Sequence, residues 1–340
     1  MFKAIRLFLL FLLLVPAAIS TPGAAASDHG ILSGERQTTD TVFMVSPDDF
    51  AFNQETAQSN LFQNKEMDSV MARKRAMTEF SGVVKRLRSS GIRVITLPSR
   101  RDVKTPDAVF PNNWFSLHRM GSGERILVGY PMLATNRRAE RRIEELKRKL
   151  RVNGIKVSRT LDLSRHEEKG KYLEGTGSMV LDRAHRIAYA SLSPRTDRTV
   201  LADFSEKMGY RPVAFSSYDS GGRLIYHTNV MMSVGDRFAV VCAEAIRDTQ
   251  ERATVLKELE QSGKSVIAIT LDQVRAMCGN ILQLHVKGKK VIMMSATAYA
   301  HFTPEQKKIL GAFGRLIPVN IETIETIGGG SSRCMLGEVF

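Results

Sequence analysis

The amino-acid sequence predicts one α/β domain, a closed propeller built from five units that each run strand, strand, helix, strand. Three observations predict it. Strand patterns come in pairs joined by polar turns such as Gly121-Ser122-Gly123 and Gly235-Asp236. A helical pattern and one further strand follow each pair. The segments that open successive units lie near Glu174, His227 and Cys278, 53 and 51 residues apart, and such a constant period indicates an internal repeat.

The first unit is incomplete where it starts. A single strand pattern at residues 41–45 is followed by a helical pattern at 66–90 and a strand at 93–97. The paired strand of this unit is missing from that part of the chain. The C-terminal segment, residues 332–340, is the candidate to supply it, and its pairing with residues 41–45 would close the ring.

The second to fifth units contain all four elements. Apolar and β-branched residues indicate the strands, and apolar positions at helical spacing indicate the helices. The predicted ranges are 113–118, 125–130, 137–152 and 155–160; 178–182, 186–190, 199–208 and 211–215; 230–234, 237–241, 249–262 and 265–269; and 281–286, 290–294, 304–313 and 315–319. A two-domain α/β protein with coincidental spacing is the alternative for a chain of 340 residues.

The N-terminus has the pattern of an export signal. Lys3 and Arg6 precede an apolar run of 13 residues, 7–19, and small residues follow up to position 26. Because this run is too short to cross a bilayer comfortably, residues 1–26 are predicted to be a cleaved signal peptide, with an N-terminal anchor as the alternative. The protein is then secreted or exported, to a periplasm or the cell exterior. Residues 27–40 are predicted to be a linker, and residues 41–340 a single folded domain.

Composition narrows the possible functions. Lys and Arg outnumber Asp and Glu by 49 to 35, which gives a formal net charge of +14 and raises the question of an anionic partner. The most basic segment, residues 137–149, has glutamates interspersed, which favours a solvated helix face over nucleic-acid binding. The three cysteines, Cys242, Cys278 and Cys334, are too few for a disulfide scaffold or a four-cysteine zinc site. We predict no metal, no organic cofactor and no nucleic-acid partner; a homo-oligomer is compatible with the sequence.

Four segments resemble, in order, the motifs of the guanidino-group-modifying enzyme superfamily, which includes amidinotransferases, arginine deiminases and dimethylarginine hydrolases. They are PDAVFPNNWF at 106–115, EGTG at 174–177, HTN at 227–229 and GGGSSRCM at 328–335. The resemblance extends over residues 41–340 and implies the pentein fold, a five-bladed α/β propeller with pseudo-fivefold symmetry. PDAVFPNNWF and the earlier SPDDFAFN at 46–53 are most similar to the citrulline hydrolase (citrullinase) branch.

Three residues are the catalytic candidates. Cys334 follows a run of three glycines, which lets the backbone approach a ligand closely, and neighbouring Arg333 would favour the thiolate. His227 opens one unit and suits a general acid–base. Glu174 holds the equivalent position one unit earlier and is expected to keep His227 protonated. Cys242 and Cys278 are predicted to pack in the core, and the other histidines to lie mostly on the surface.

Two asparagines bear on the substrate. By resemblance, enzymes of this superfamily that act on arginine carry a carboxylate at the position of Asn113, and arginine deiminases carry an aspartate at that of Asn229. A guanidinium is cationic and only donates hydrogen bonds, whereas a ureido group is neutral and has a carbonyl acceptor. Both asparagines therefore favour citrulline. Asp107 is a candidate to bind the substrate amine end or to cap the turn of its motif, and the planar fork of Arg333 is a candidate for the substrate carboxylate.

The predicted protein is thus a cysteine hydrolase of carbon–nitrogen bonds, which converts citrulline to ornithine, ammonia and carbon dioxide through a covalent Cys334 intermediate. The alternatives among enzymes are an arginine deiminase, a dimethylarginine hydrolase or an amidinotransferase. The alternative from another class is a non-catalytic binding module of the same fold. The complete set of Cys334, His227 and Glu174 argues against the binding module.

Overall fold

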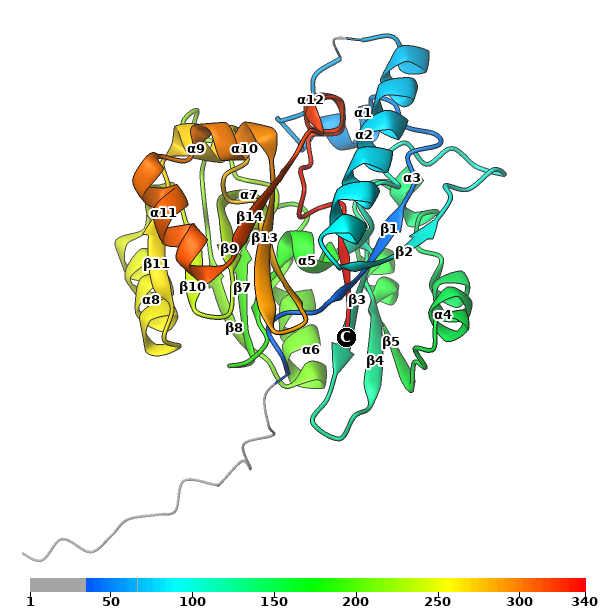
Figure 1. Ribbon diagram of the computed structural model, residues 1–340. Coiled ribbons are helices and arrows are strands. Elements are labelled where there is room, and N and C mark those ends of the chain that lie inside the picture. The colour runs from blue at the N-terminus through cyan, green and yellow to red at the C-terminus, as the bar shows by residue number, and fades with distance from the viewer. Residues whose placement is uncertain (1–34, 66) are drawn as a thin grey trace, which may run out of the picture. The chain divides into compact units, whose positions relative to one another are not determined.

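The computed structural model describes residues 35–65 and 67–340. The predicted leader, residues 1–26, and residues 27–34 of the predicted linker lie outside this part of the chain. The described residues form five three-stranded sheets, each built from one sequence unit (Figure 1). In each sheet the central strand is antiparallel to one neighbour and parallel to the other. The predicted fold of five ββαβ units is confirmed.

The first sheet joins the two ends of the folded chain. Strand β1 (Thr41–Val45) is parallel to β2 (Arg93–Leu97) and antiparallel to β15 (Gly337–Val339). Figure 1 shows the blue β1 next to the red C-terminal segment. The whole of β1 is buried, because neighbouring strands and helices cover both of its faces. The C-terminal segment therefore supplies the missing strand, as the sequence predicted.

The other four sheets follow the chain in order, and each consists of a hairpin followed by a parallel strand. Their strands are β3 (Phe115–Arg119), β4 (Arg125–Gly129) and β5 (Arg159–Asp162); β6 (Val180–Asp182), β7 (Ile187–Ser191) and β8 (Arg211–Phe215); β9 (Met232–Val234), β10 (Phe238–Val241) and β11 (Ser265–Ala268); and β12 (Leu282–Val286), β13 (Lys289–Ser295) and β14 (Arg315–Val319).

One longer helix crosses from the second to the third strand of each unit and buries its apolar side on the sheet. These helices are α2 (Ser69–Ser89), α4 (Ile143–Val152), α6 (Arg198–Met208), α8 (Thr249–Gln261) and α11 (Pro304–Phe313). The side chains of Asp68, Asp197, Asp248 and Thr303 accept hydrogen bonds from the backbone at the starts of α2, α6, α8 and α11. Such caps satisfy N–H groups that have no partner within the helix.

Short helices fill the connections. They are α1 (Gln54–Ala57), α3 (Thr135–Arg138), α5 (Gly175–Ser178), α7 (Thr228–Met231), α9 (Leu271–Arg275), α10 (Ala296–His301) and α12 (Glu322–Gly328), with 3₁₀ turns η1 (Pro111–Asn113), η2 (Ser164–Lys169) and η3 (Ala243–Ala245). Sequence periodicity did not predict the four-residue helices, because one turn is too short to show a helical period. The short helices α5 and α7 open two units and directly follow the candidate residues Glu174 and His227.

Two predicted elements differ from the structure. The helix expected at 137–152 divides into α3 and α4, because Arg137 turns into the interior rather than toward solvent. The strand expected at 155–160 is β5, which begins four residues later, at Arg159. Ile155 and Val157 alternate with polar residues and so resemble a strand, but the parallel pairing with β4 begins only at Arg159, opposite Ile126.

The folded part also begins before the predicted boundary at residue 41. Residues 35–40 belonged to the predicted linker, but Glu35 is only 3% exposed. It accepts a hydrogen bond from Arg183 Nη1 at 3.0 Å, and Gln37 Nε2 donates to the carbonyl oxygens of Leu181 and Val234. Polar residues can be buried where partners satisfy them, and a pattern of hydrophobicity cannot reveal such partners.

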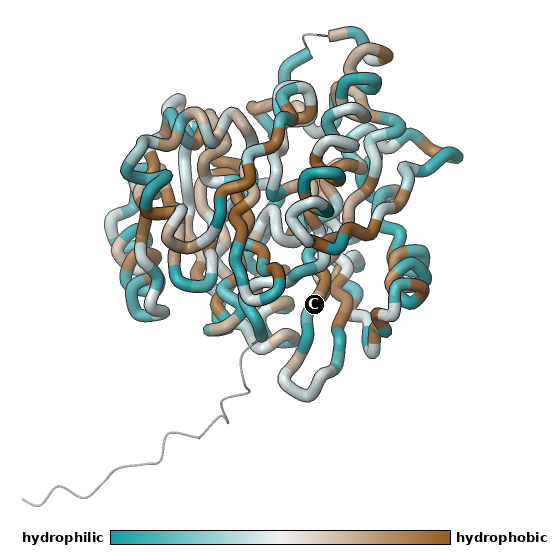
Figure 2. The backbone as a smooth tube through the Cα atoms, viewed as in Figure 1, coloured by the Kyte–Doolittle hydropathy of each residue, from teal (hydrophilic) through white to brown (hydrophobic). Residues whose placement is uncertain are grey.

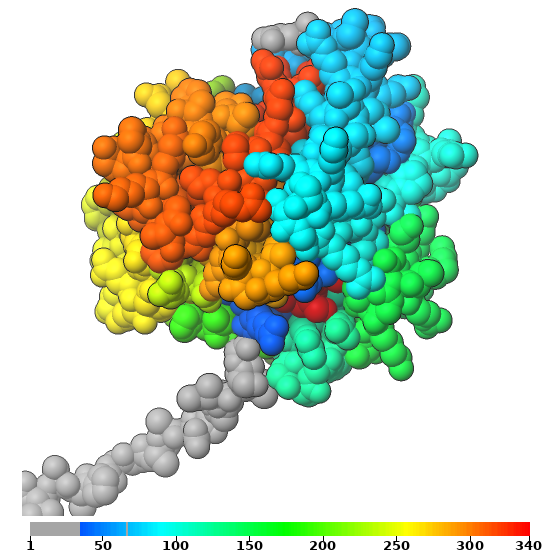
Figure 3. All heavy atoms as spheres, viewed as in Figure 1, coloured from blue at the N-terminus to red at the C-terminus, as the bar shows by residue number. Residues whose placement is uncertain are grey.

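Buried apolar residues are concentrated in the strands and in the helices that cover them. Figure 2 shows apolar residues as brown segments of the backbone. In the space-filling view the C-terminal residues appear only as a small red patch between neighbouring segments (Figure 3). Across residues 35–65 and 67–340, no helix has both the length and the apolar character needed to cross a membrane.

Candidate active site

The ring brings the candidate residues together from distant parts of the sequence. Cys334 and His227 line one small cavity and are 3% and 2% exposed. Asp107 and Asn113 line the same cavity. Glu174 is fully buried directly behind His227. His227 and Glu174 are the residues immediately before α7 and α5, so the repeat places them at equivalent ends of neighbouring units.

His227 and Glu174 form a buried pair. Nε2 of His227 lies 2.8 Å from Oε2 of Glu174, and Arg195 Nη1 lies 3.4 Å from the same oxygen. The backbone N–H of Leu133 donates to Oε1. Burial alone would raise the pKa of Glu174, but Arg195 and His227 hold it well below its usual range. Glu174 is therefore ionised and accepts a hydrogen bond from Nε2–H, which leaves Nδ1 as the basic nitrogen of a neutral imidazole.

The protonation state of His227 differs from the sequence prediction. Burial lowers the pKa of His227 to about 4, although Glu174 opposes this change. The imidazole is consequently neutral at neutral pH before substrate binds. We expected Glu174 to keep the ring protonated, but the loss of hydration outweighs the attraction of one carboxylate that also pairs with Arg195.

Two asparagine amides contact the sulfur of Cys334. Asn280 Nδ2 lies 3.3 Å from Sγ, and Asn229 Nδ2 lies 3.4 Å from it. Asn280 also donates to the Asn229 carbonyl and accepts from the backbone N–H of Arg333, so it fixes the Cys334 segment. N–H donors directed at sulfur suit an anionic sulfur. Sequence analysis missed Asn280, although it lies 51 residues after Asn229 and so repeats its place in the next unit.

Glycines allow the close approach of these groups. A Cβ atom at Gly177 would lie 2.3 Å from Asn113 Nδ2 and 2.8 Å from His227 Nδ1. A Cβ atom at Gly330 would lie 2.8 Å from the Phe110 ring. Real Cβ atoms do not come so close to their neighbours, so both positions need glycine. The glycines in EGTG and GGGSSRCM therefore bring Asn113, His227 and the Cys334 segment within reach of one another.

Asn113 has a fixed orientation. Its Oδ1 accepts a hydrogen bond of 2.9 Å from Arg137 Nη1, and a guanidinium can only donate. The Nδ2 group of Asn113 must therefore face the other way. It is buried and finds no acceptor among the described residues. A buried donor without a partner is costly, and this one is available to a ligand in the cavity.

Two acceptors near the cavity are also unpartnered. Asp107 Oδ2 accepts from Asn53 Nδ2 at 2.8 Å and from Thr56 Oγ1 at 3.0 Å, whereas its Oδ1 is buried without a donor in the described part of the chain. The same holds for Oδ1 of Asn229, whose Nδ2 contacts Cys334. Both oxygens can accept hydrogen bonds from a bound molecule.

The structure does not bring Arg333 to this cavity. Its Nη1 donates to the Leu336 carbonyl at 2.8 Å, and its Nη2 lies 2.6 Å from Glu338 Oε2. The backbone of residues 333–334 turns so that these consecutive side chains point in different directions. The assignment of Arg333 to the substrate carboxylate does not fit this geometry.

Sequence analysis missed two arginines that line the cavity. Arg137 is 2% exposed and pairs with Glu140, whose pKa burial raises to about 7. We had placed this basic segment on a solvated face. Arg195 donates from Nη2 to the Thr56 carbonyl at 2.9 Å and to Ser59 Oγ at 2.7 Å. It comes from a polar turn after β7, where nothing in the local pattern singles it out.

The segment around α1 covers the cavity. Arg195 is bonded to Thr56 and Ser59, and Asn60 Nδ2 lies 3.4 Å and 3.3 Å from the carbonyl oxygens of Gly328 and Gly329. The enclosed space is only about 10 Å³, which is less than one amino acid needs. Side chains of this segment must move to admit a substrate.

The other two cysteines are packed in the core, as predicted. Burial raises the pKa of Cys242 to about 11 and that of Cys278 to about 12, so both are thiols at neutral pH. Among the other described histidines, His118 is fully buried, with Nδ1 3.2 Å from Glu35 Oε2. The remaining four, His166, His185, His285 and His301, are partly or fully exposed, so most lie at the surface as predicted. Within the described ranges, no group of three His, Cys, Asp or Glu side chains is arranged to hold a metal ion.

Residues 46–340 match the model of a protein family described as N,N dimethylarginine dimethylhydrolase, eukaryotic. The chain belongs to this family. It is therefore a member of the guanidino-group-modifying superfamily, as its four motifs predicted, and falls among hydrolases of guanidino compounds. A search of curated proteins found no match.

Solved structures agree on the fold. Unliganded AgrE superposes with a TM-score of 0.67 at 16% identity over 88% of this chain and 39% of AgrE. The substrate-bound N-terminal domain of ArgZ, an arginine dihydrolase from the ornithine–ammonia cycle in Cyanobacteria, gives 0.66 at 14% identity over 88% and 97% of the two chains. A dimethylarginine dimethylaminohydrolase adduct with S-methyl-L-thiocitrulline gives 0.58 at 15% identity over 89% and 100%. The chain thus spans about two fifths of the length of AgrE, and at these identities the likeness concerns the fold.

Proposed function

We propose that the protein is a cysteine hydrolase that converts citrulline to ornithine, ammonia and carbon dioxide. The observation that carries the proposal is the unpartnered Nδ2 donor of Asn113, which Arg137 orients. A ureido carbonyl oxygen can accept that hydrogen bond, whereas a guanidinium has no acceptor to offer. The choice between the two substrates therefore rests on one buried amide whose orientation is fixed by its neighbour.

The carboxylates around the cavity support the same choice. Glu140 is engaged by Arg137, and both oxygens of Glu174 are engaged by His227, Arg195 and Leu133. Among these described carboxylates, Asp107 alone has an unpartnered oxygen. A cationic guanidinium taken out of water needs several anionic acceptors, and a neutral ureido group does not.

The two ends of the amino acid have candidate partners. Oδ1 of Asp107 can accept from the substrate ammonium group. Arg195 replaces Arg333 as the candidate for the substrate carboxylate. It lines the cavity, and its Nε and Nη2 atoms bond only to neutral groups of Thr56 and Ser59, while Nη1 faces Glu174. A carboxylate is a stronger partner for a guanidinium than a hydroxyl or a carbonyl, so it can displace them when the covering segment moves.

The proposed mechanism begins with a neutral His227. Nδ1 takes the proton of the Cys334 thiol, and the sulfur attacks the ureido carbon while Asn113 N–H binds the developing oxyanion. The imidazolium, stabilised by Glu174, gives its proton to the ornithine nitrogen as the carbon–nitrogen bond breaks. This leaves a carbamoyl group on Cys334. His227 then activates water, and the released carbamate decomposes to ammonia and carbon dioxide.

A substrate panel tests the proposal. Purified protein is incubated with citrulline, arginine and asymmetric dimethylarginine, and ornithine, citrulline, ammonia and dimethylamine are quantified. We expect ornithine and ammonia from citrulline, with a Cys334→Ser variant as the inactive control. Turnover of arginine or dimethylarginine without ornithine from citrulline would refute citrulline as the substrate while leaving the hydrolase class intact.

A second candidate is dimethylarginine hydrolysis, which the family description names. The unpartnered acceptors Asp107 Oδ1 and Asn229 Oδ1 are the feature of the site that favours it, because a guanidinium has N–H groups to donate to both. In that reaction Cys334 attacks the guanidino carbon, dimethylamine leaves and water releases citrulline. Dimethylamine in the same panel distinguishes this reaction from citrulline hydrolysis.

A further inference from the structure

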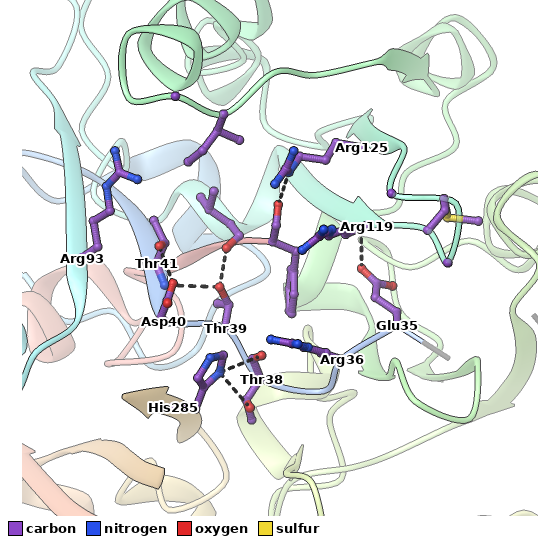
Figure 4. A pocket seen from close by; sticks show the side chains of 17 residues that line it. Glu35, Arg36, Thr38, Thr39, Asp40, Thr41, Arg93, Arg119, Arg125 and His285 are labelled. Atoms are coloured by element: carbon purple, nitrogen blue, oxygen red, sulfur yellow. Dashed lines mark hydrogen bonds between the residues drawn. The ribbon is translucent and has the colours of Figure 1, made fainter. Parts of the chain in front are cut away.

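A second, larger cavity lies away from Cys334. It has a volume of about 500 Å³ and is bounded by residues 35–41, the β3–β4 turn, His285 and the C-terminal Val339 and Phe340 (Figure 4). It shares no lining residue with the Cys334 cavity. Thr41 begins β1 and Val339 ends β15, whereas Cys334 precedes β15. The large cavity is therefore at the opposite end of this sheet from the candidate nucleophile.

Four arginines surround this cavity, and their charges are poorly compensated. Arg36 and Arg119 have guanidinium groups without a hydrogen-bond or ion-pair partner in the described residues, and Arg93 donates only to Asn153, which is neutral. Arg125 Nε donates to the Phe340 carbonyl oxygen at 2.7 Å. Figure 4 shows these side chains around one opening. Burial and the neighbouring Arg119 lower the pKa of Arg125, as expected where cations repel each other.

The acidic residues of the cavity do not neutralise these arginines. Glu35 is engaged by Arg183, His118 and Tyr210, all from the interior. Asp40 Oδ1 accepts a hydrogen bond from Thr41 Oγ1. His285 also lines the cavity, and its Nδ1–H donates to the Thr38 carbonyl oxygen at 3.0 Å. Arg36 and Arg119 consequently remain available to an anion.

We propose that this cavity binds a ligand through a phosphate group held by Arg36 and Arg119, with Arg93 and Arg125 as further donors. A phosphate dianion has enough oxygens to engage several planar guanidinium groups at once, which a single carboxylate does not. The volume is within the range of cavities that hold nucleotide-sized or headgroup-sized molecules. The phosphate can belong to a soluble metabolite or to the headgroup of an anionic lipid, and both present the same chemistry to the arginines.

Binding of a defined probe tests the proposal. The full chain is titrated with inorganic pyrophosphate by calorimetry, and its sedimentation with phosphatidylcholine vesicles is measured with and without phosphatidic acid. The test variant is R36A/R119A. The matched control is R148A/R151A, two exposed arginines of α4 whose side chains lack ion-pair partners in the described chain. Circular dichroism checks that both variants are folded.

We expect saturable binding of pyrophosphate or of phosphatidic acid vesicles by the natural chain. R36A/R119A should weaken it by at least about tenfold, because two charge-assisted hydrogen-bonding groups are lost. R148A/R151A should bind as the natural chain does. Pyrophosphate binding indicates a soluble ligand, and vesicle binding alone indicates a lipid headgroup. The absence of both, or an equal weakening by the control pair, would overturn the proposal. Hydrolytic activity toward the substrate panel should be the same in both variants, so this result is independent of the proposed function.

Discussion

Replacement of Asn113 is the most direct test of how the site selects a ureido group. In Asn113→Ala the N–H donor is lost without a new charge. In Asn113→Asp an oxygen replaces the amide nitrogen that faces the cavity, so an acceptor opposes the substrate carbonyl. Arg137, which now bonds to Asn113 Oδ1 at 2.9 Å, can still pair with the aspartate and hold it in the same place. Asn113→Asp keeps an oxygen for Arg137, whereas Asn113→Ala also removes the oxygen that accepts from Arg137 Nη1. Circular dichroism therefore checks that both variants are folded.

The size of the effect follows from when the hydrogen bond acts. A neutral hydrogen bond to the bound substrate contributes about 0.5–1.5 kcal/mol. Loss of one donor to a developing oxyanion costs about 2.7–4 kcal/mol in protein active sites, which corresponds to about 10²–10³-fold in rate. We therefore expect Asn113→Ala to lower kcat/KM for citrulline by about 10²–10³-fold, mostly through kcat. Asn113→Asp should lose at least as much, because an anion also repels the oxyanion.

The assay is steady-state formation of ornithine from citrulline across substrate concentrations. Asn112→Ala is the control, since Asn112 is the neighbouring buried asparagine of η1 but does not line the cavity. Its kcat/KM should stay within about threefold of the natural chain because it loses no contact with the reacting atoms. Near-natural activity of Asn113→Ala would refute the role of Asn113 in binding the carbonyl. An equal loss in Asn112→Ala would show that the loop, and not the donor, is responsible.

Three further predictions concern single residues. Iodoacetamide should alkylate Cys334 and abolish activity. Cys242 and Cys278 should stay unmodified in peptide mass maps, because burial raises their pKa values to about 11 and about 12. Inactivation through Cys278 would contradict the assignment of Cys334 as the nucleophile. Because the pKa of His227 is about 4, kcat/KM of the natural chain should fall only as the pH drops toward 4. Glu174→Gln removes the group that raises this pKa, so the fall should move to lower pH. A shift of the fall toward pH 6.5 would count against a neutral His227. Glu35→Gln should lower the free energy of unfolding at neutral pH by about 3–5 kcal/mol, since it leaves Arg183 buried with one partner fewer. Arg183 and His118 hold the pKa of Glu35 at about 2 against the effect of burial. The stability that Glu35 contributes is therefore present above about pH 4.5 and disappears as the pH falls toward 2. An equal difference in unfolding free energy between the natural chain and Glu35→Gln at pH 7 and pH 3, measured by denaturant unfolding, would contradict this prediction.

The repeat made most of the fold predictable. Strand pairs with polar turns and a period near 52 residues are local features, and they predicted five units and the closure by residues 332–340. The antiparallel pairing of Thr41 with Val339 confirms this closure. The sequence predictions were wrong at charged residues that are buried in the structure. Arg137 and Glu35 belong to polar segments, and ion pairs with Glu140 and Arg183 offset the cost of burying their charges.

The candidate site was predictable in part for the same reason. Motifs identified Cys334, His227 and Glu174, which the structure places together. Asn280 was not predicted, although the repeat makes its position equivalent to that of Asn229. The sequence did not predict a role for Arg195, because the local pattern around an arginine in a turn does not show whether its side chain is solvated or buried. Arg333 was misassigned because adjacency in sequence to Cys334 does not mean adjacency in the cavity.

The five-unit ring, the residues available for chemistry and the presence of asparagine at positions 113 and 229 follow from the sequence alone. The tertiary structure decided which groups face the cavity and in what state. Arg137 orients the Asn113 amide, and burial makes His227 neutral despite its pairing with Glu174. Hydrogen-bond direction and hydration depend on neighbours that lie far away along the chain, and these neighbours exist only once the ring has closed.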